Sequence, residues 1–158
     1  MNNFAKYSIK GMQSFKTDDG IAFSGSLCFD GNKVASFCNH GNGGSTDIHY
    51  VSKDAELNFI NTAKEEGFDA KYVGIDEMAI DRLADASDGL KVLKRNLKKY
   101  VCFVLPNHGP GAYGNLSTNE VTSKVINYLD SKYPKYDILN NKSDEDLWSL
   151  VLSWYKAS

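Results

Sequence analysis

The sequence predicts an α+β fold with a four-stranded antiparallel β-meander at the N-terminus, packed with helices and followed by a mixed C-terminal part. Residues 1–52 alternate apolar and polar side chains between turn sequences, as strands do. Residues 53–99 instead repeat apolar residues every three or four positions, as amphipathic helices do. The chain has 158 residues, of which 42% are hydrophobic, and no linker separates residues 1–52 from residues 53–158. We therefore expect a single domain.

The four expected strands are divided by polar, glycine-containing turns. They cover Tyr7 to Phe15, Ile21 to Phe29, Lys33 to His40 and Asp47 to Val51. Asp18-Asp19-Gly20 forms the first turn, and Asp30-Gly31 is a strong signal for a two-residue hairpin loop. Gly25 lies inside the second strand, where a glycine indicates a bulge or a close approach to the backbone.

Two helical patterns follow the meander. Asp54 is suited to cap a helix that runs to about Glu66, with Gly67 just after its end. The second pattern starts near Asp76, and its apolar residues form one stripe: Ala79, Leu83, Ala86, Leu90, Leu93 and Leu97. Ser87-Asp88-Gly89 interrupts this stripe, and glycine costs about 1 kcal/mol inside a helix. One helix and two helices with a kink are both open.

The C-terminal part is expected to mix strands and helices. Residues 100–105 are apolar and predict a strand buried on both faces, and residues 106–116 predict a polar loop. Ser117 and Glu120 have capping-box spacing, which predicts a helix through Val121, Val125 and Leu129. Tyr136 to Leu139 reads as a short strand. A last helix starts at Ser143 and should dock into the core through its apolar face: Leu147, Trp148, Leu150, Val151, Trp154 and Tyr155.

Composition excludes several classes of protein. The net charge is −2 and only Arg82 and Arg95 are arginines among 18 basic residues, which disfavours non-specific nucleic-acid binding. Five basic residues lie close together at the end of the second helix: Lys91, Lys94, Arg95, Lys98 and Lys99. They either interact favourably with the negative C-terminal end of the helix dipole or form a patch that contacts phosphate. Three cysteines that are not spaced as a disulfide framework, and the lack of an apolar leader or membrane span, predict a cytoplasmic protein without a membrane partner.

The segment from Cys38 to His49 gathers residues that can carry chemistry. If it turns on Gly43-Gly44, Cys38 faces His49 and His40 faces Asp47, with all four side chains on one face of the hairpin. A thiol, two imidazoles and a carboxylate are ligands for zinc or another divalent metal. The same pattern is also typical of the solvated side of a hairpin, in which His40, Asn42 and His49 contact a ligand or a partner without metal.

The segment from Gly109 to Gly114 matches G-x-G-x-x-G, the glycine pattern of dinucleotide-binding folds. In those folds the helix opens at the second glycine, and an acidic residue follows the next strand. Here the capping signal lies at Ser117, and Asn140 stands where the acidic residue is required. The segment is therefore expected to be a loop that recognises a ligand or partner, with His108 and Tyr113 as contact residues.

Several short segments resemble small uncharacterised bacteriophage proteins. The likeness rests on the following stretches: Ser8-Ile9-Lys10-Gly11-Met12, Ser14-Phe15, Asp19-Gly20, Phe29 to Ala35, Gly41 to Gly44, Lys132-Tyr133 and Ile138-Leu139-Asn140. The resemblance assigns no activity to any residue. It implies a small phage accessory protein that acts in the cytoplasm of the bacterial host.

These observations lead to a functional expectation that needs no cofactor. Small phage accessory proteins without catalytic signatures act by stoichiometric binding, so we expect a binding module rather than an enzyme. It would inhibit a host or defence protein or sequester a small nucleotide signal, and self-association into a homo-oligomer is left open. The alternatives are a minor virion component and a small metal-dependent hydrolase that uses Cys38, His40, Asp47 and His49, with or without His108.

Overall fold

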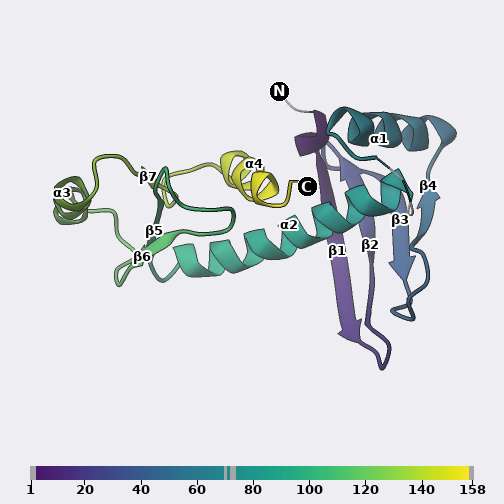
Figure 1. The fold of residues 1–158 in the computed structure, drawn as a ribbon, viewed down its shortest axis with the longest axis horizontal. Coiled ribbons are helices and arrows are strands. Elements are labelled where there is room, and N and C mark those ends of the chain that lie inside the picture. Colours follow the sequence, from purple (N-terminus) through teal and green to yellow (C-terminus); the bar gives the residue numbers. More distant parts are fainter. Residues whose placement is uncertain (1–2, 70, 72–73, 157–158) are drawn as a thin grey trace. The chain divides into compact units, whose positions relative to one another are not determined.

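The computed structural model describes residues 3–69, 71 and 74–156, and it confirms the α+β class (Figure 1). The described residues divide into two compact units, those up to residue 87 and residues 88–156. The division falls inside a long helix rather than at the end of the β-rich part. The expectation that the chain behaves as one domain stays a prediction. No described helix has the length and apolar character that crossing a lipid bilayer requires.

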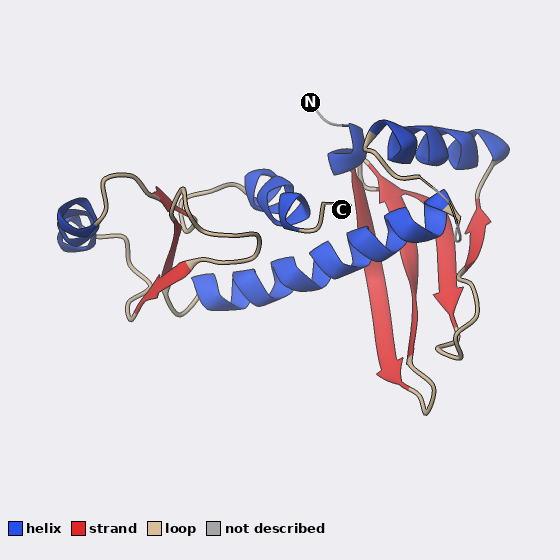
Figure 2. Cartoon of the chain, in the orientation of Figure 1, coloured by secondary structure: helices blue, strands red, loops and turns tan. Residues whose placement is uncertain are grey.

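The first unit is built on the expected antiparallel meander (Figure 2). After the short 3-10 helix η1 (Asn3–Lys6), the strands pair in the order β1-β2-β3-β4, and their bounds are β1 (Tyr7–Lys16), β2 (Ile21–Phe29), β3 (Asn32–Asn39) and β4 (Asp47–Tyr50). Asp30 and Gly31 have φ angles of 46° and 82°. Positive φ at both positions is what a two-residue hairpin loop needs, so the Asp-Gly prediction is confirmed.

Two glycines of the meander have distinct structural reasons. Gly25 pairs with Phe37, and a Cβ at this position would lie 2.8 Å from the Phe37 ring. The close approach, rather than a bulge, therefore explains the glycine inside β2. The register shifts elsewhere, between Lys10 and Gln13 in β1, where Gly11 has a φ of 61°, and between Leu27 and Cys28 in the pairing of β2 with β3.

The helices α1 (Lys53–Glu65) and α2 (Ile75–Leu97) complete the first unit, α2 with its N-terminal part. α1 begins two residues earlier than expected, because the Ser52 side chain, not Asp54, accepts from the Ala55 N–H at 3.1 Å. Gly67, with a φ of 101°, follows the C-cap as predicted. Asp54 instead lies in the first turn, where its negative charge interacts favourably with the positive end of the helix dipole.

An aromatic cluster and one buried arginine form the centre of this unit. The Phe4 ring lies 6.4 Å from Phe59 and 5.6 Å from Phe68. The buried Arg82 guanidinium lies 5.1 Å from the Phe4 ring, and its Nη2 is 2.9 Å from the Glu66 carboxylate. Ring contact and ion pairing together make burial of this charge tolerable.

α2 is one continuous helix, so of the two alternatives the unbroken helix is correct. Its apolar stripe is buried as predicted at Ala79, Leu83, Ala86 and Leu93, each with no exposed surface. Gly89 does not break the helix. A Cβ there would lie 2.7 Å from the Tyr155 hydroxyl, so the glycine makes room for a tyrosine of the same unit.

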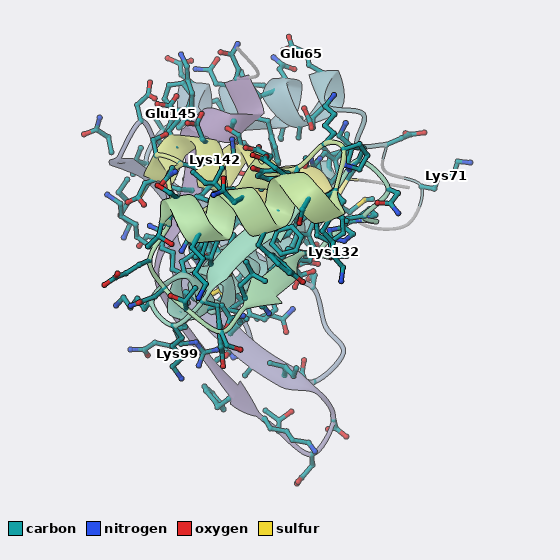
Figure 3. All side chains as sticks on the ribbon, turned by 90° about the vertical axis from the view of Figure 1, so that its left-hand side faces the viewer. Glu65, Lys71, Lys99, Lys132, Lys142 and Glu145 are labelled. Carbon is teal, nitrogen blue, oxygen red and sulfur yellow. The ribbon has the colours of Figure 1, made fainter. Side chains whose placement is uncertain are left out.

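The second unit contains a small antiparallel sheet and two helices. The sheet has the order β6-β5-β7, with the buried strand β5 (Val101–Val104) between β6 (Gly114–Leu116) and β7 (Asp137–Ile138). α3 (Ser123–Lys132) and α4 (Asp144–Trp154) complete it. Val101, Phe103, Val125 and Leu129 form the core between β5 and α3. Charged side chains such as Lys99 and Lys132 point away from the ribbon (Figure 3).

The predicted start of α3 is wrong by about five residues. The N-cap is Thr122, whose hydroxyl accepts from the Val125 N–H at 3.3 Å, not Ser117. The segment before it belongs to the sheet, because Leu116 pairs with Val101 and the Thr118 carbonyl accepts from the Val101 N–H. Pairing between distant segments thus overrides a local capping-box pattern.

The terminal helix α4 docks as expected. Ser143 is its N-cap, and Leu147, Val151 and Leu152 are buried. The Trp154 ring stacks on Tyr113 with centroids 6.1 Å apart and an interplanar angle of 14°. The apolar face of α4 is therefore part of the second unit's core.

Candidate functional site

The β3–β4 hairpin carries the predicted polar face, but its register differs from the prediction. Cys38 pairs with Asp47 and Ser36 pairs with His49, whereas the sequence had placed Cys38 opposite His49. The shift is two residues. Because side chains alternate along a strand, a two-residue shift leaves Cys38, Asp47 and His49 on the same face.

The shift arises because the hairpin does not turn tightly on Gly43-Gly44. Residues 40–46 form a longer loop, closed by the Asn39 side chain. Its Oδ1 accepts from the Gly41 N–H at 2.9 Å, and its Nδ2 donates to the Thr46 hydroxyl at 3.1 Å. Asn42 does the same locally, because its Oδ1 accepts from the Gly44 N–H at 3.1 Å. Asn42 is thus a loop-forming residue as well as a predicted contact residue.

The four residues considered for a metal do not form a ligand cluster. His40 Nε2 lies 3.6 Å from Asp47 Oδ2, with the two side chains 66% and 60% exposed. His49 is exposed, opposite Ser36. Among the residues that the structure describes, no three His, Cys, Asp or Glu side chains are placed to hold a metal ion. The hydrolase interpretation gains no support from this geometry.

The residues predicted in the glycine-rich loop are engaged within the second unit. His108 Nδ1 accepts from the Leu105 N–H at 3.2 Å, which closes the loop at the end of β5. The Tyr113 hydroxyl accepts from Asn96 Nδ2 at 2.7 Å. Gly109 to Gly114 leads into strand β6 and not into a helix, which excludes a dinucleotide-binding turn. His108 and Tyr113 therefore hold the loop in place.

Part of the basic cluster of α2 is neutralised within the second unit. Lys91 Nζ lies 3.0 Å from the Asp88 carboxylate, and Lys94 Nζ lies 2.8 Å from that of Asp144. These pairs favour the structural interpretation of the cluster. Lys91 and Lys94 line a shallow hollow on the surface of α2 together with Arg95 and Lys98.

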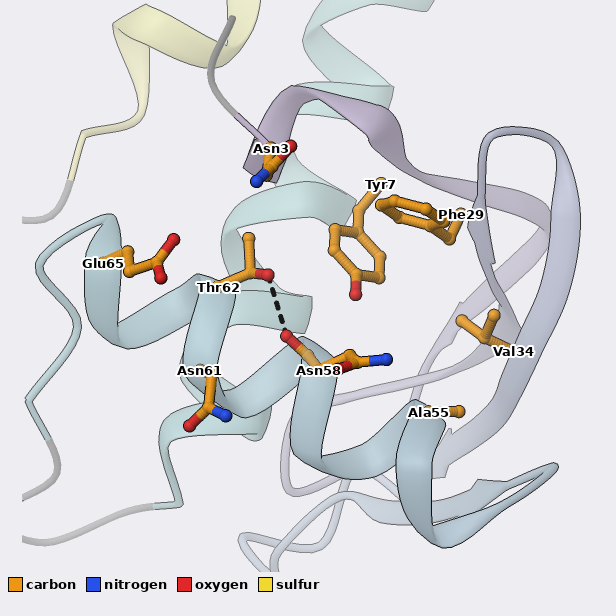
Figure 4. Close-up of a pocket in the computed structure, with 9 residues that line it drawn as sticks. All are labelled: Asn3, Tyr7, Phe29, Val34, Ala55, Asn58, Asn61, Thr62 and Glu65. Carbon is orange, nitrogen blue, oxygen red and sulfur yellow. Dashed lines mark hydrogen bonds between the residues drawn. The ribbon is translucent and has the colours of Figure 1, made fainter.

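Sequence reasoning missed a pocket in the first unit. This pocket, here called the α1 pocket, has a volume of about 410 Å³ and opens between α1 and the strands (Figure 4). The residues that line it come from η1, β1, β2, β3 and α1: Asn3, Tyr7, Phe29, Val34, Ala55, Asn58, Asn61, Thr62 and Glu65. All of them belong to the first unit.

The α1 pocket combines neutral hydrogen-bonding side chains with the carboxylate of Glu65. The Tyr7 and Phe29 rings lie 4.8 Å apart and form an aromatic wall, and the Tyr7 hydroxyl points toward α1 (Figure 4). Burial raises the pKa of Tyr7, against the opposing effect of a hydrogen bond with Thr62, so the hydroxyl stays protonated. Three carboxamides and the Thr62 hydroxyl add donors and acceptors from η1 and α1.

A sequence signal for this pocket exists, although it is ambiguous. Asn58, Asn61, Thr62 and Glu65 follow one another at helical spacing, so they form one polar face of α1. Such a face is typical of a solvated helix. It becomes one side of a pocket only because η1 and β2 pack opposite it.

Comparison of the chain with protein-family models, with curated proteins and with solved structures finds no match. The function is therefore inferred from the geometry and chemistry of the α1 pocket and the strands around it. The α1 pocket has a size that suits a small ligand.

Proposed function

We propose that this chain is a small accessory protein of bacteriophage type that acts by stoichiometric binding, and that the α1 pocket takes the nucleoside part of a nucleotide signal. The observation that carries the proposal is one pocket that joins an aromatic wall to several neutral hydrogen-bonding side chains. A volume of about 410 Å³ lies within the range of small-molecule sites.

The side chains of the α1 pocket match the chemistry of a nucleobase. A carboxamide can donate to and accept from the edge of a base at the same time, as Asn does with adenine. The half-buried Phe29 ring, backed by the buried Tyr7 ring, offers a surface on which a base packs. The Lys6 ammonium lies 5.8 Å from the Phe29 ring centre, where it suits a phosphate group that extends out of the pocket.

The same side chains favour binding over catalysis. General acid or base catalysis works best with a group whose pKa is near the operating pH. The pKa of the Tyr7 hydroxyl is already well above neutral pH, and burial raises it further. Thr62 is the aliphatic hydroxyl of the pocket, and it donates to the Asn58 backbone carbonyl at 2.8 Å rather than to a general base. Capture of a ligand without turnover is the function that this set supports best.

Isothermal titration calorimetry with the four nucleosides and their 5′-monophosphates tests the proposal. We expect one of the bases to bind with a stoichiometry of one, and Asn58→Ala to weaken it about tenfold through the loss of a hydrogen bond to the base. Asn127→Ala, on the exposed face of α3, is the matched control and should bind as the wild type does. Lys6→Gln should weaken the nucleotide and leave the nucleoside unchanged.

Two results would contradict the proposal. One is the absence of binding by every base, and the other is equal loss of affinity in Asn58→Ala and Asn127→Ala. Chromatography of the ligand after incubation with the protein tests whether the ligand is bound without being converted. Recovery of the unchanged ligand is expected, and conversion of the ligand would mean that the protein is an enzyme.

A further inference from the structure

β1 offers a free edge in the first unit. It lies at one end of the strand order and is hydrogen-bonded to β2 alone, as the outermost strand of the meander (Figure 2). The five residues Met12 to Lys16 lie between the bulge at Gly11 and the turn that follows Lys16. Gln13 to Lys16 pair regularly with β2, and Met12 directly precedes them. All of them except Met12 are exposed. We call this segment the β1 free edge.

The β1 free edge also exposes apolar surface. The Phe15 side chain is 66% exposed, and Ile21, on the neighbouring strand, is 62% exposed. Both line a hollow of about 550 Å³ at the end of the hairpin. Natural sheets usually protect edge strands, because unpaired backbone groups and apolar side chains together are a template for another strand.

We propose that the β1 free edge pairs antiparallel with the β1 free edge of a second copy of this chain, with Ser14 on the two-fold axis. The register follows from the length of the segment. Ser14 is the middle of Met12 to Lys16, so symmetric pairing of the whole segment places each Ser14 opposite the other. Gln13 then faces the second copy's Phe15, and Met12 faces its Lys16.

This register covers the exposed apolar side chains. Phe15 shares a face with Ala22, its partner on β2, and the two Phe15 rings become diagonal neighbours about 7–8 Å apart across the axis. On the opposite face, Ile21 is paired with Lys16, and the second copy's Met12 joins them. Each exposed apolar residue of the hairpin end thus gains an apolar or aliphatic neighbour.

The charges select a second copy and an antiparallel direction. Lys10 lies before the β1 free edge, and Asp18 and Asp19 lie after it. Within the described part of the chain neither aspartate forms an ion pair, and Lys10 Nζ donates to the Gly31 carbonyl at 3.1 Å. Antiparallel pairing brings the basic end of each edge to the acidic end of the other, twice in one symmetric contact.

Sedimentation velocity of the full chain over about 5–500 µM tests self-association. A five-residue edge buries less surface than a standard interface, so we expect a dimer that forms only in the micromolar range. Phe15→Ser should raise the dimer dissociation constant about fivefold to tenfold. Lys10→Asp should raise it about threefold, and the double change Lys10→Asp/Asp18→Lys should restore it. A monomer at all concentrations would overturn the proposal.

Disulfide trapping tests the register, in a Cys38→Ser background that leaves the buried Cys28 and Cys102 in place. Cysteines can bridge only where their Cβ atoms approach to about 4 Å. Ser14→Cys on the axis should form a covalent dimer, and Gln13→Cys, one residue away, should not. Equal crosslinking of the two variants, or crosslinking of Gln13→Cys alone, would exclude this register. Circular dichroism establishes whether each variant is folded. If a variant is unfolded, sedimentation of the wild type still tests the proposal.

Discussion

The Glu77 carboxylate accepts a hydrogen bond from the backbone N–H of Thr46, with Oε2 and nitrogen 2.9 Å apart. Thr46 is buried, so this bond satisfies a backbone donor that water does not reach. One residue earlier on α2, the Asp76 carboxylate accepts from the Tyr50 hydroxyl at 3.1 Å. The acidic first turn of α2 therefore holds both the β3–β4 loop and β4. Burial and the Asp76 charge together raise the pKa of Tyr50 well above its usual range.

Glu77→Ala should destabilise the protein, because it leaves the buried Thr46 N–H without a partner. The expected loss in free energy of unfolding is about 1–3 kcal/mol, measured by urea denaturation. Glu120→Ala removes an exposed glutamate in the second unit and should change it by less than about 0.5 kcal/mol. Equal effects of the two substitutions would mean that the bond to Thr46 is not stabilising.

Asp81→Asn should stabilise the protein at neutral pH. Partial burial, followed by repulsion from Asp85 and Glu77, raises the pKa of Asp81 to about 6 in the folded state. Because its pKa is higher in the folded state, the protonated carboxyl favours folding. This contribution to stability is complete below the unfolded pKa near 4 and is lost as the pH rises through 6. Removal of two like-charge pairs one helical turn apart should gain about 0.4–1 kcal/mol at pH 7 and nothing at pH 3.5.

Asp88→Asn is the control for this pH dependence. Its carboxylate lies 3.0 Å from Lys91 Nζ, so its loss should lower stability slightly at pH 7, by up to about 0.5 kcal/mol. The measurement is thermal or urea unfolding of the wild type and both variants between pH 3.5 and pH 7.5. An Asp81→Asn curve parallel to the wild-type curve would show that Asp81 has an ordinary pKa.

Asn140→Ala should weaken the second unit more than an ordinary surface change. Its Oδ1 accepts from the Cys102 N–H at 2.8 Å, and its Nδ2 donates to the Tyr100 carbonyl at 2.8 Å. The side chain thus bridges β5 and the segment before it. Loss of these bonds should cost about 2–4 kcal/mol in urea unfolding, whereas Asn141→Ala, at an exposed neighbour, should cost less than about 0.5 kcal/mol.

Limited proteolysis should cut first in the loop between β5 and β6, where residues 106–107 and 109–112 are exposed. If the chain behaves as one domain, no pair of stable fragments should arise from cleavage elsewhere. Mass spectrometry of the first products identifies the site. Early cleavage within α2 near residues 87–88, with two fragments that persist, would show that the two units fold independently.

The elements that were predicted well are those with local causes. Alternation and the Asp30-Gly31 turn specify the β-meander within a few residues of chain, and Ser143 and Gly67 mark helix ends directly. The errors arose where contacts between segments distant in the sequence determine the local structure. The β3–β4 loop is long because Gly41 packs against β2, where a Cβ would lie 2.5 Å from the Ala22 nitrogen. The start of α3 moved because β5 takes residues 114–116 into a sheet.

The α1 pocket shows the same limit for a functional site. Sequence reasoning singled out histidines, a cysteine and glycine-rich turns, because these residue types are frequent in catalytic and metal sites. The pocket instead uses asparagines, a threonine and a tyrosine, which are ordinary on a helix surface or in a core. Only the packing of α1 against η1 and the strands turns Tyr7 and Asn58 into neighbours across a cavity.

NMR spectroscopy of the side-chain amides tests directly whether the α1 pocket binds a nucleoside. We expect the NH₂ signals of Asn58 and Asn61 to shift in a saturable way during titration with the base selected by calorimetry, while those of Asn127 on α3 stay in place. Saturation at one ligand per chain is the expected end point. Shifts confined to the β3–β4 loop or to the second unit, with Asn58 and Asn61 unmoved, would contradict it.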